Sequence, residues 1–399
     1  MKNSKKGFTL VELLVVIAIV AILATVAVIG YTSFTKKADI SNDTVIAKEL
    51  TTLIQATDIN DPVENFDDVM SVLYANGFYL ANLNTKTEGC FFVWDSANNQ
   101  ILLVDGKDNF NVIFPESGYS EKGAAWHLIC SDRDLLDGLD VTGISVQYAV
   151  VSSDSLNELI AAGQDKIYVD EGFVIAEGSG IDFTGKDNVT LVLGESSLST
   201  NGTINGAPIH VENSTLTVEG GTLNASGNFT NEYGTFSCAI GYDGGAKLNV
   251  TDVNFIGITG INGAMNRDGE VTLVVENSTF NVTSGGVIMS TGTSTSTATI
   301  NNCTINANRY ALFVSQTGTM TVNGGTYKGG TAVLYCQDAG SKIVVNGGSF
   351  DGAITITNGA ALEINAGTFV NTGLTLEQFS AFVTDGKTVT EDNGAFIVK

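Results

Sequence analysis

The sequence predicts a mixed fold class, in which a long N-terminal α-helix and a small α+β head precede a right-handed parallel β-helix (β-solenoid). Three observations lead to this prediction: an apolar run behind three lysines, a helical pattern followed by two strand patterns, and a phrase that recurs every 19 to 25 residues. We expect the helix over residues 8–59, the head over 60–150, the β-helix over 155–385 and a C-terminal cap or tail over 386–399.

The N-terminal apolar run contains a single charge. Three lysines precede Gly7, and between residues 8 and 30 the only charged side chain is Glu12. As a helix this run would be about 35 Å long, enough to cross a bilayer, and the lysines would keep the N-terminus in the cytoplasm. A carboxylate at membrane depth is costly, so we predict a functional role for Glu12.

The stretch KKGFTLVELLVVIAIVAILATVAVIGY resembles the class III leader of type IV prepilins. This resemblance implies that residues 1–7 are a leader, that a prepilin peptidase cleaves between Gly7 and Phe8, and that Phe8 is then N-methylated. It also implies that Glu12 neutralises the new N-terminal amine of a neighbouring subunit in the core of a fibre. A buried acid is tolerable beside a buried amine where an unpaired acid is not.

The segment 60–150 is predicted to be a small α+β head. FDDVMSVLYANGFYL has helical spacing and ends at Gly77, and CFFVWD and NQILLVDG read as two strands joined by a short polar turn. The order ISNDT, a helix, then VWD and a buried strand resembles the small pseudopilin-like heads of Gram-positive prepilins. Trp94 and Trp126 are predicted to be core or interface anchors. A disulfide between Cys90 and Cys130 is one alternative, but five scattered cysteines favour buried thiols.

One phrase recurs in the third segment as VENSTF, INNCTI, VNGGTY, VNGGSF and INAGTF. Short β-branched strands with Gly or Asn turns at such a period predict a parallel β-helix, in which the inward side chains of each coil stack on those of the next. The architecture resembles the β-helices of surface and carbohydrate-active proteins. A short helix over 155–163 is expected to cap the first coil. The predicted inward row consists of Leu198, Leu223, Phe255, Phe280, Ile305, Tyr327, Phe350 and Phe369.

Two polar rows are predicted at the turns of the β-helix. Asn323, Asn346 and Asn365 align as the members of an amide ladder would, so each could hydrogen-bond to its equivalent one coil away. A second aligned row consists of Thr279, Thr304, Thr326, Ser349 and Thr368.

The composition restricts the partners and the chemistry. The chain has 43 Asp and Glu against 19 Lys and Arg, a net charge of −24, which argues against nucleic acid as a partner. His127 and His210 lack any partner pattern, so no catalytic triad, metal site or cofactor is predicted. Some acidic loops could offer oxygen ligands to Ca²⁺, but no Asp-x-Asp-x-Asp loop occurs; these loops contain Asp182, Asp187, Asp243 and Asp252.

We therefore expect a type IV pilin-like subunit that polymerises through its N-terminal helix and displays the β-helix on a surface filament for adhesion. The expected partners are the prepilin peptidase, other pilin subunits, the pilus assembly machinery, the cytoplasmic membrane before assembly, and a glycan or other surface ligand. The precursor would cross the membrane once.

Two alternatives to this function remain open. One is a pseudopilin of a type II secretion or competence system, and the other is a membrane-tethered enzyme that acts on polysaccharides. Arg267, Asp268 and Glu270, in one loop, are candidates for catalysis. Further candidates in later coils are Arg309, Lys328 and Asp351. These side chains do not align regularly across coils, so we expect no enzyme. The exposed aromatic residues are scattered along the sequence and form no extended row, so the sequence predicts no position for a sugar-binding site.

Overall fold

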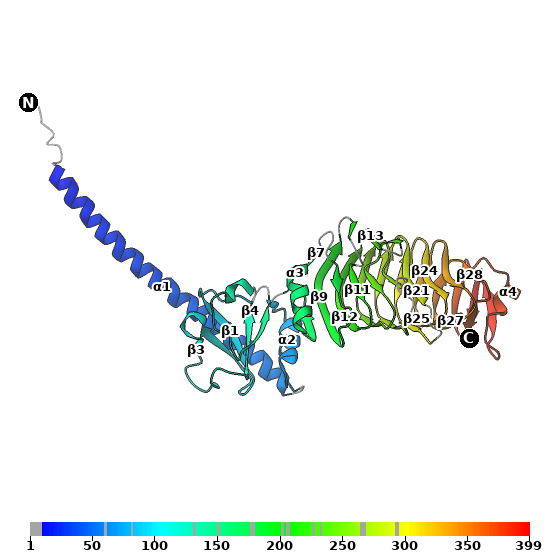
Figure 1. Cartoon of the computed structure of the whole chain (residues 1–399), viewed down its shortest axis with the longest axis horizontal. Coiled ribbons are helices and arrows are strands. Elements are labelled where there is room, and N and C mark those ends of the chain that lie inside the picture. The colour runs from blue at the N-terminus through cyan, green and yellow to red at the C-terminus, as the bar shows by residue number, and fades with distance from the viewer. Residues whose placement is uncertain are drawn as a thin grey trace, which may run out of the picture. The chain divides into compact units, whose positions relative to one another are not determined.

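The computed structural model describes residues 10–399, apart from residues 60–61, 81–82, 131–132, 149, 151, 176–179, 201–202, 205–207, 226–227, 232–233, 264–268 and 292–294. The chain divides into two compact units, Met1–Tyr148 and Ala149–Lys399. The first unit contains a long helix and a small sheet, and the second is a stack of strands (Figure 1). The predicted order of a helical region and a large parallel β-solenoid is confirmed.

The first unit begins with α1 (Leu10–Asp58), a helix of 49 residues. Its N-terminal part exposes apolar side chains, and Leu14 and Leu23 are each 62% exposed. Toward its C-terminal end the helix packs against strand β2 (Gln100–Asp105) and helix α2 (Phe66–Ala75). Ala47, Leu50 and Ile54 are fully buried there. The second half of α1 is therefore part of the core of the head.

A buried carboxylate also joins α1 to the head. Asp43 accepts hydrogen bonds from the backbone N–H of Lys86 at 2.8 Å, from the N–H of Thr87 at 2.9 Å and from Oγ1 of Thr87 at 2.7 Å. Farther along the helix, Oγ1 of Thr51 accepts from the N–H of Ile101 at 2.9 Å. Because these donors would be left unsatisfied without their acceptors, the register between helix and head is fixed.

The head contains α2 (Phe66–Ala75) and a five-stranded sheet with the order β3-β2-β1-β4-β5. A capping box of Asn65 and Asp68 starts the helix, and the predicted hairpin of β1 and β2 is antiparallel, with Trp94 opposite Ile101. The strands are β1 (Cys90–Asp95), β2 (Gln100–Asp105), β3 (Asn111–Phe114), β4 (Trp126–Cys130) and β5 (Ser145–Tyr148), and the 3₁₀ turns are η2 (Gly106–Asp108) and η3 (Arg133–Leu136).

The core of the head contains both tryptophans. Trp94 and Trp126 are 1% and 2% exposed, as expected for core anchors. All five cysteines of the chain are buried thiols, so the alternative of a Cys90–Cys130 disulfide is wrong. Burial raises the pKa of the Cys90 thiol to about 11, which keeps it protonated and unreactive at neutral pH.

The second unit is a parallel solenoid with two long sheets and a small one. The eight-stranded sheet contains, in spatial order, β28 (Ile354–Thr357), β26 (Ala332–Gln337), β24 (Tyr310–Gln316), β21 (Gly285–Thr291), β18 (Ile261–Gly263), β15 (Ile240–Tyr242), β11 (Ile209–Val211) and β8 (Ile181–Asp182).

The sixteen-stranded sheet supplies the other wall. It contains β6 (Lys166–Tyr168), β7 (Phe173–Ile175), β9 (Val189–Thr200), β12 (Thr215–Ala225), β16 (Lys247–Thr251), β17 (Asn254–Gly257), β19 (Thr272–Glu276), β20 (Thr279–Val282), β22 (Thr297–Asn301), β23 (Thr304–Ala307), β25 (Gly318–Gly329), β27 (Ser341–Asp351), β29 (Ala361–Ile364), β30 (Gly367–Val370), β31 (Val389–Asp392) and β32 (Ala395–Val398). The small sheet contains β10 (Thr203–Ile204), β13 (Asn228–Asn231) and β14 (Gly234–Phe236).

The inward row predicted from the recurring phrase is the core of the solenoid. Every member lies in register with the next, from Leu198 through Leu223 and Phe255 to Phe369. Neighbouring rings stack nearly parallel, with 4.3 Å between the centroids of Phe255 and Phe280. The Thr and Ser row beside it is likewise in register.

The predicted amide ladder forms at the outer edge of the same sheet. Nδ2 of Asn346 donates to Oδ1 of Asn323 at 2.8 Å, and Nδ2 of Asn365 donates to Oδ1 of Asn346 at 2.8 Å. The ladder extends to Asn301 on one side and to Thr384 on the other. Each side chain thus satisfies its neighbour one coil away, which fixes the register of the coils.

Glycine and the two ends complete the solenoid. At Gly325 the backbone bends with φ +93°, and a Cβ there would collide with the carbonyl oxygen of Cys303, so only glycine fits.

A short helix lies near each end of the second unit. Helix α3 (Ser153–Ala162) starts the unit, and helix α4 (Leu376–Ser380) lies near its C-terminus. The ring centroid of Phe379 in α4 lies 5.1 Å from that of Phe369. The strand β32 then pairs antiparallel with β30 and covers its edge.

Candidate functional site

The predicted processing and assembly residues lie at the start of the chain. Gly7 and Phe8 lie outside the described residues, and Glu12 lies in the first turn of α1 with an exposed side chain. Around it, Leu10 and Leu13 are 79% and 55% exposed. A contiguous exposed apolar surface of this kind is typical of a segment that is covered by lipid or by another protein.

A membrane span was expected over residues 8–30. Within the ranges that the structure describes, no helix meets the length and apolarity that crossing a membrane requires. The single pass of the precursor therefore stays a prediction.

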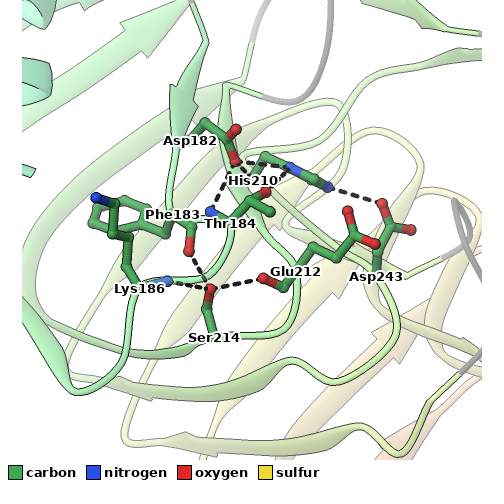
Figure 2. Close-up of polar contacts among 8 residues, drawn as sticks. All are labelled: Asp182, Phe183, Thr184, Lys186, His210, Glu212, Ser214 and Asp243. Carbon is green, nitrogen blue, oxygen red and sulfur yellow. Dashed lines mark hydrogen bonds and ion pairs between the residues drawn. The ribbon is translucent and has the colours of Figure 1, made fainter. Parts of the chain in front are cut away.

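A second group of polar side chains lies on three successive strands of the eight-stranded sheet, as Figure 2 shows. His210 of β11 lies in register with Asp182 of β8. Its Nδ1 is 3.1 Å from Oδ1 of Asp182, and its Nε2 is 2.8 Å from Oδ2 of Asp243, which follows β15. The imidazole thus bridges the coils on either side, and the prediction that His210 has no partner was wrong.

The neighbouring residues hold this bridge in place (Figure 2). Oγ1 of Thr184 donates to Oδ1 of Asp182 at 2.6 Å, and the N–H of Thr184 donates to the same oxygen at 3.0 Å. After β11, Oγ of Ser214 donates to the carbonyl oxygens of Phe183 and Glu212, which closes the turn that carries the Glu212 side chain. The side chain of Asp243 is only 7% exposed.

The electrostatics of the cluster favour a charged imidazole. Burial alone would lower the pKa of His210, but the hydrogen bonds and charges of Asp243 and Asp182 raise it above its ordinary value. Burial likewise opposes the charge of Asp182, yet the hydrogen bonds from Thr184 and His210 bring its pKa below the ordinary value. The cluster therefore favours the imidazolium form of His210, and this side chain joins three coils through Asp182 and Asp243.

The same cluster has the donor set of a cation site. His210, Glu212 and Asp243 each offer one ligand atom, and these atoms lie within 4.8 Å of one another. One imidazole nitrogen and two carboxylates suit a transition metal such as Zn²⁺. The imidazolium already balances the carboxylates at acidic pH, so a proton and a divalent cation would compete for this position.

We expect the solenoid to lose stability as the pH rises from about 6.5 through the raised pKa of folded His210. A histidine whose pKa is raised on folding contributes stability that is complete below its unfolded pKa, about 6.5, and is lost as the pH rises through the folded value. Urea midpoints of the full chain, followed by far-ultraviolet circular dichroism, should fall over this range, and His210→Gln should remove the fall.

The matched control for this prediction is His127→Gln. His127 stacks on Phe66 with 5.0 Å between the ring centroids, and burial lowers its pKa. The contribution of His127 to stability therefore has the opposite pH dependence. It is present above the unfolded pKa and is lost as the pH falls. The decrease in the urea midpoint with rising pH should therefore persist in His127→Gln. An equal decrease in His210→Gln would contradict its assignment to His210.

The residues considered for catalysis do not gather at one place in the described part of the chain. Arg267 and Asp268 lie outside the described residues, and Glu270 is exposed. Nζ of Lys328 lies 3.6 Å from Oδ2 of Asp351, in an ion pair between adjacent coils. Such an exposed pair contributes about 1 kcal/mol or less to stability and assigns no catalytic role.

Comparison with known protein families gives a match at the N-terminus. Residues 2–28 match the family model of the prokaryotic N-terminal methylation motif. No curated protein and no solved structure matches the chain. The motif supports a type IV pilin-like or pseudopilin protein, and it implies processing by a prepilin peptidase, membrane insertion and assembly with pilin machinery.

Proposed function

We propose that this chain is a type IV pilin-like subunit that polymerises through α1 and displays its solenoid on a surface filament for adhesion. The observation that carries the proposal is the overlap of the methylation motif, residues 2–28, with α1, Leu10–Asp58. One helix thus has an exposed apolar first half suited to a fibre core and a second half buried in a folded head.

The adhesive role is supported by the kind of head that α1 carries. The solenoid is rigid, because rows of stacked rings and amide ladders repeat in it coil after coil. An extended sheet face with one side open to solvent is a suitable binding surface for an extended ligand. A pseudopilin would share the motif but does not need a head of this size.

The alternative of a polysaccharide-acting enzyme rests on the cluster around His210. Its carboxylates lie on three successive coils, but Asp182 and Asp243 are engaged by the imidazole. We therefore propose a structural rather than a catalytic role for them. Release of reducing or unsaturated sugar ends by the chain, abolished in Asp243→Asn, would favour the enzyme instead.

Gly7→Ala is expected to block or strongly slow removal of the leader, so that precursor starting at Met1 accumulates in the membrane fraction. The proposed reason is steric, because the peptidase would accept only the smallest residue before the cleaved bond. Intact-mass measurement of the membrane-extracted chain distinguishes the precursor from a chain that starts at Phe8.

The control for this prediction is a nearby leader substitution, Asn3→Ala, which should be processed normally. Normal processing of Gly7→Ala would contradict the assignment of residues 1–7 as a leader.

A further inference from the structure

We propose that the outer face of the eight-stranded sheet between β18 and β26 binds a glycan, with Tyr310 and Tyr335 as the stacking platform. The inference deepens the adhesive function proposed above and rests on it for its biological meaning. The binding itself is a property of the solenoid face and needs no filament.

The strand register gathers this face from residues far apart in the sequence. Asn262, Ile288, Phe313 and Tyr335 are direct neighbours on four successive strands. The residues that precede the last three of them, Val287, Leu312 and Leu334, are fully buried. Because side chains alternate across a strand, the row that contains Phe313 and Tyr335 points away from the core.

Three aromatic rings lie together on the outward side. The centroids of Tyr310 and Tyr335 are 5.1 Å apart with 25° between the ring planes, and Phe313 lies 4.9 Å from Tyr335. All three rings are partly exposed, whereas the inward rings of the solenoid are buried. The core is complete without these outer rings, and a partly exposed aromatic group of this kind is typical of a binding surface.

Polar side chains surround the rings and define a shallow cleft of about 390 Å³. Ser290, Ser315 and Gln337 line it, and Oγ of Ser315 donates to Oγ of Ser290 at 3.0 Å. Among the described residues that line the cleft, Arg309 alone is charged, and its guanidinium lies 5.0 Å from the centroid of the Tyr310 ring. The arrangement therefore combines flat apolar faces with hydroxyl, amide and guanidinium groups.

A sugar matches this combination better than other ligands do. The C–H face of a pyranose ring stacks on an aromatic ring, and its hydroxyl edge needs donors and acceptors such as those of Ser290 and Gln337. A polyanionic nucleic acid is disfavoured by the net charge of −24. A single guanidinium can still pair with one carboxylate, so Arg309 favours an acidic sugar unit.

The test is binding of the detergent-solubilised full chain to an array of bacterial, plant and animal glycans that includes neutral and uronic acid oligosaccharides. We expect binding to a subset of the array, and a loss of affinity of about tenfold or more in Tyr335→Ala, which removes a stacking anchor. Arg309→Gln, an exposed change, should weaken binding of uronic acid oligosaccharides more than of neutral ones. The control is Tyr119→Ala, which removes an exposed tyrosine of the other unit and should bind normally.

The outcomes separate this inference from the proposed function. Absence of binding to any glycan on the array, or unchanged binding by both Tyr335→Ala and Arg309→Gln, would overturn the glycan site whatever the filament does. Binding that Tyr335→Ala weakens, in a chain that never appears in filaments, would uphold the site and overturn the filament. Circular dichroism of each variant shows that a loss of binding does not come from unfolding.

Discussion

Glu12→Ala is expected to abolish filament assembly while removal of the leader continues. In the proposed fibre core, the carboxylate of Glu12 pairs with the N-methylated amine of Phe8 of a neighbouring subunit. Removal of one partner of a buried ion pair costs about 3–5 kcal/mol, which is a factor of at least about a hundred in the affinity of each contact. Sheared filaments should disappear, while the membrane fraction contains chains that start at Phe8.

Two variants separate charge from shape and position in this prediction. Glu12→Gln keeps the size of the side chain and should also fail to assemble, because the amine would stay without a counter-charge. Glu49→Ala removes an exposed acid farther along the same helix and should assemble normally. Normal filaments from Glu12→Ala would contradict the charge-pair account.

Phe350→Ala is expected to reduce the free energy of unfolding of the solenoid by about 3–5 kcal/mol. Phe350 is 1% exposed, and its ring lies between those of Tyr327, at 4.9 Å, and Phe369, at 4.7 Å. Truncation leaves a cavity in a continuous stack, and both neighbouring rings lose packing contacts at once. Urea unfolding followed by circular dichroism measures the loss.

Phe313→Ala is the matched comparison for this substitution. It removes the same side chain from the outward row of the other sheet, where the ring is partly exposed. The expected cost is about 1 kcal/mol or less, because little buried volume is lost. Equal costs for the two variants would contradict the distinction between an inward core row and an outward binding row.

The sequence was sufficient to predict the wall of the solenoid that carries the recurring phrase. Two Asn-Gly-Gly turns and one Asn-Ala-Gly turn align Asn323, Asn346 and Asn365, and the residue after the Ser or Thr of each phrase is the inward Phe or Tyr. A one-residue slip would turn each of these rings outward, so burial and the turn chemistry specify the same register. The pattern was visible because the requirement repeats in every coil.

The His210 cluster could not be predicted in the same way. Asp182, His210 and Asp243 are neighbours in space, but 28 residues separate the first two and 33 the last two. The strands that carry them are short, and loops of unequal length separate them, so no period marks their alignment. Glu212 lies two residues from His210 in the sequence, but Asp182 and Asp243 do not lie near it, so the sequence alone does not predict the bridge.

The group of three aromatic rings on the outer face of the eight-stranded sheet could not be predicted from the sequence for a related reason. Tyr310 and Phe313 belong to β24 and Tyr335 to β26, and no recurring turn phrase aligns these two strands in the sequence. Outward positions also have no burial requirement that would repeat a residue type from coil to coil. Their proximity followed only once the parallel pairing of β24 and β26 placed Phe313 beside Tyr335.

The central claim is that a processed N-terminus builds this chain into a filament. Mass spectrometry of the N-terminal peptide, in filaments sheared from cells and in the membrane fraction, tests it most directly. The account predicts sheared chains that start at N-methylated Phe8, with residues 1–7 absent. Chains that still start at Met1 and occur only in membranes would contradict it.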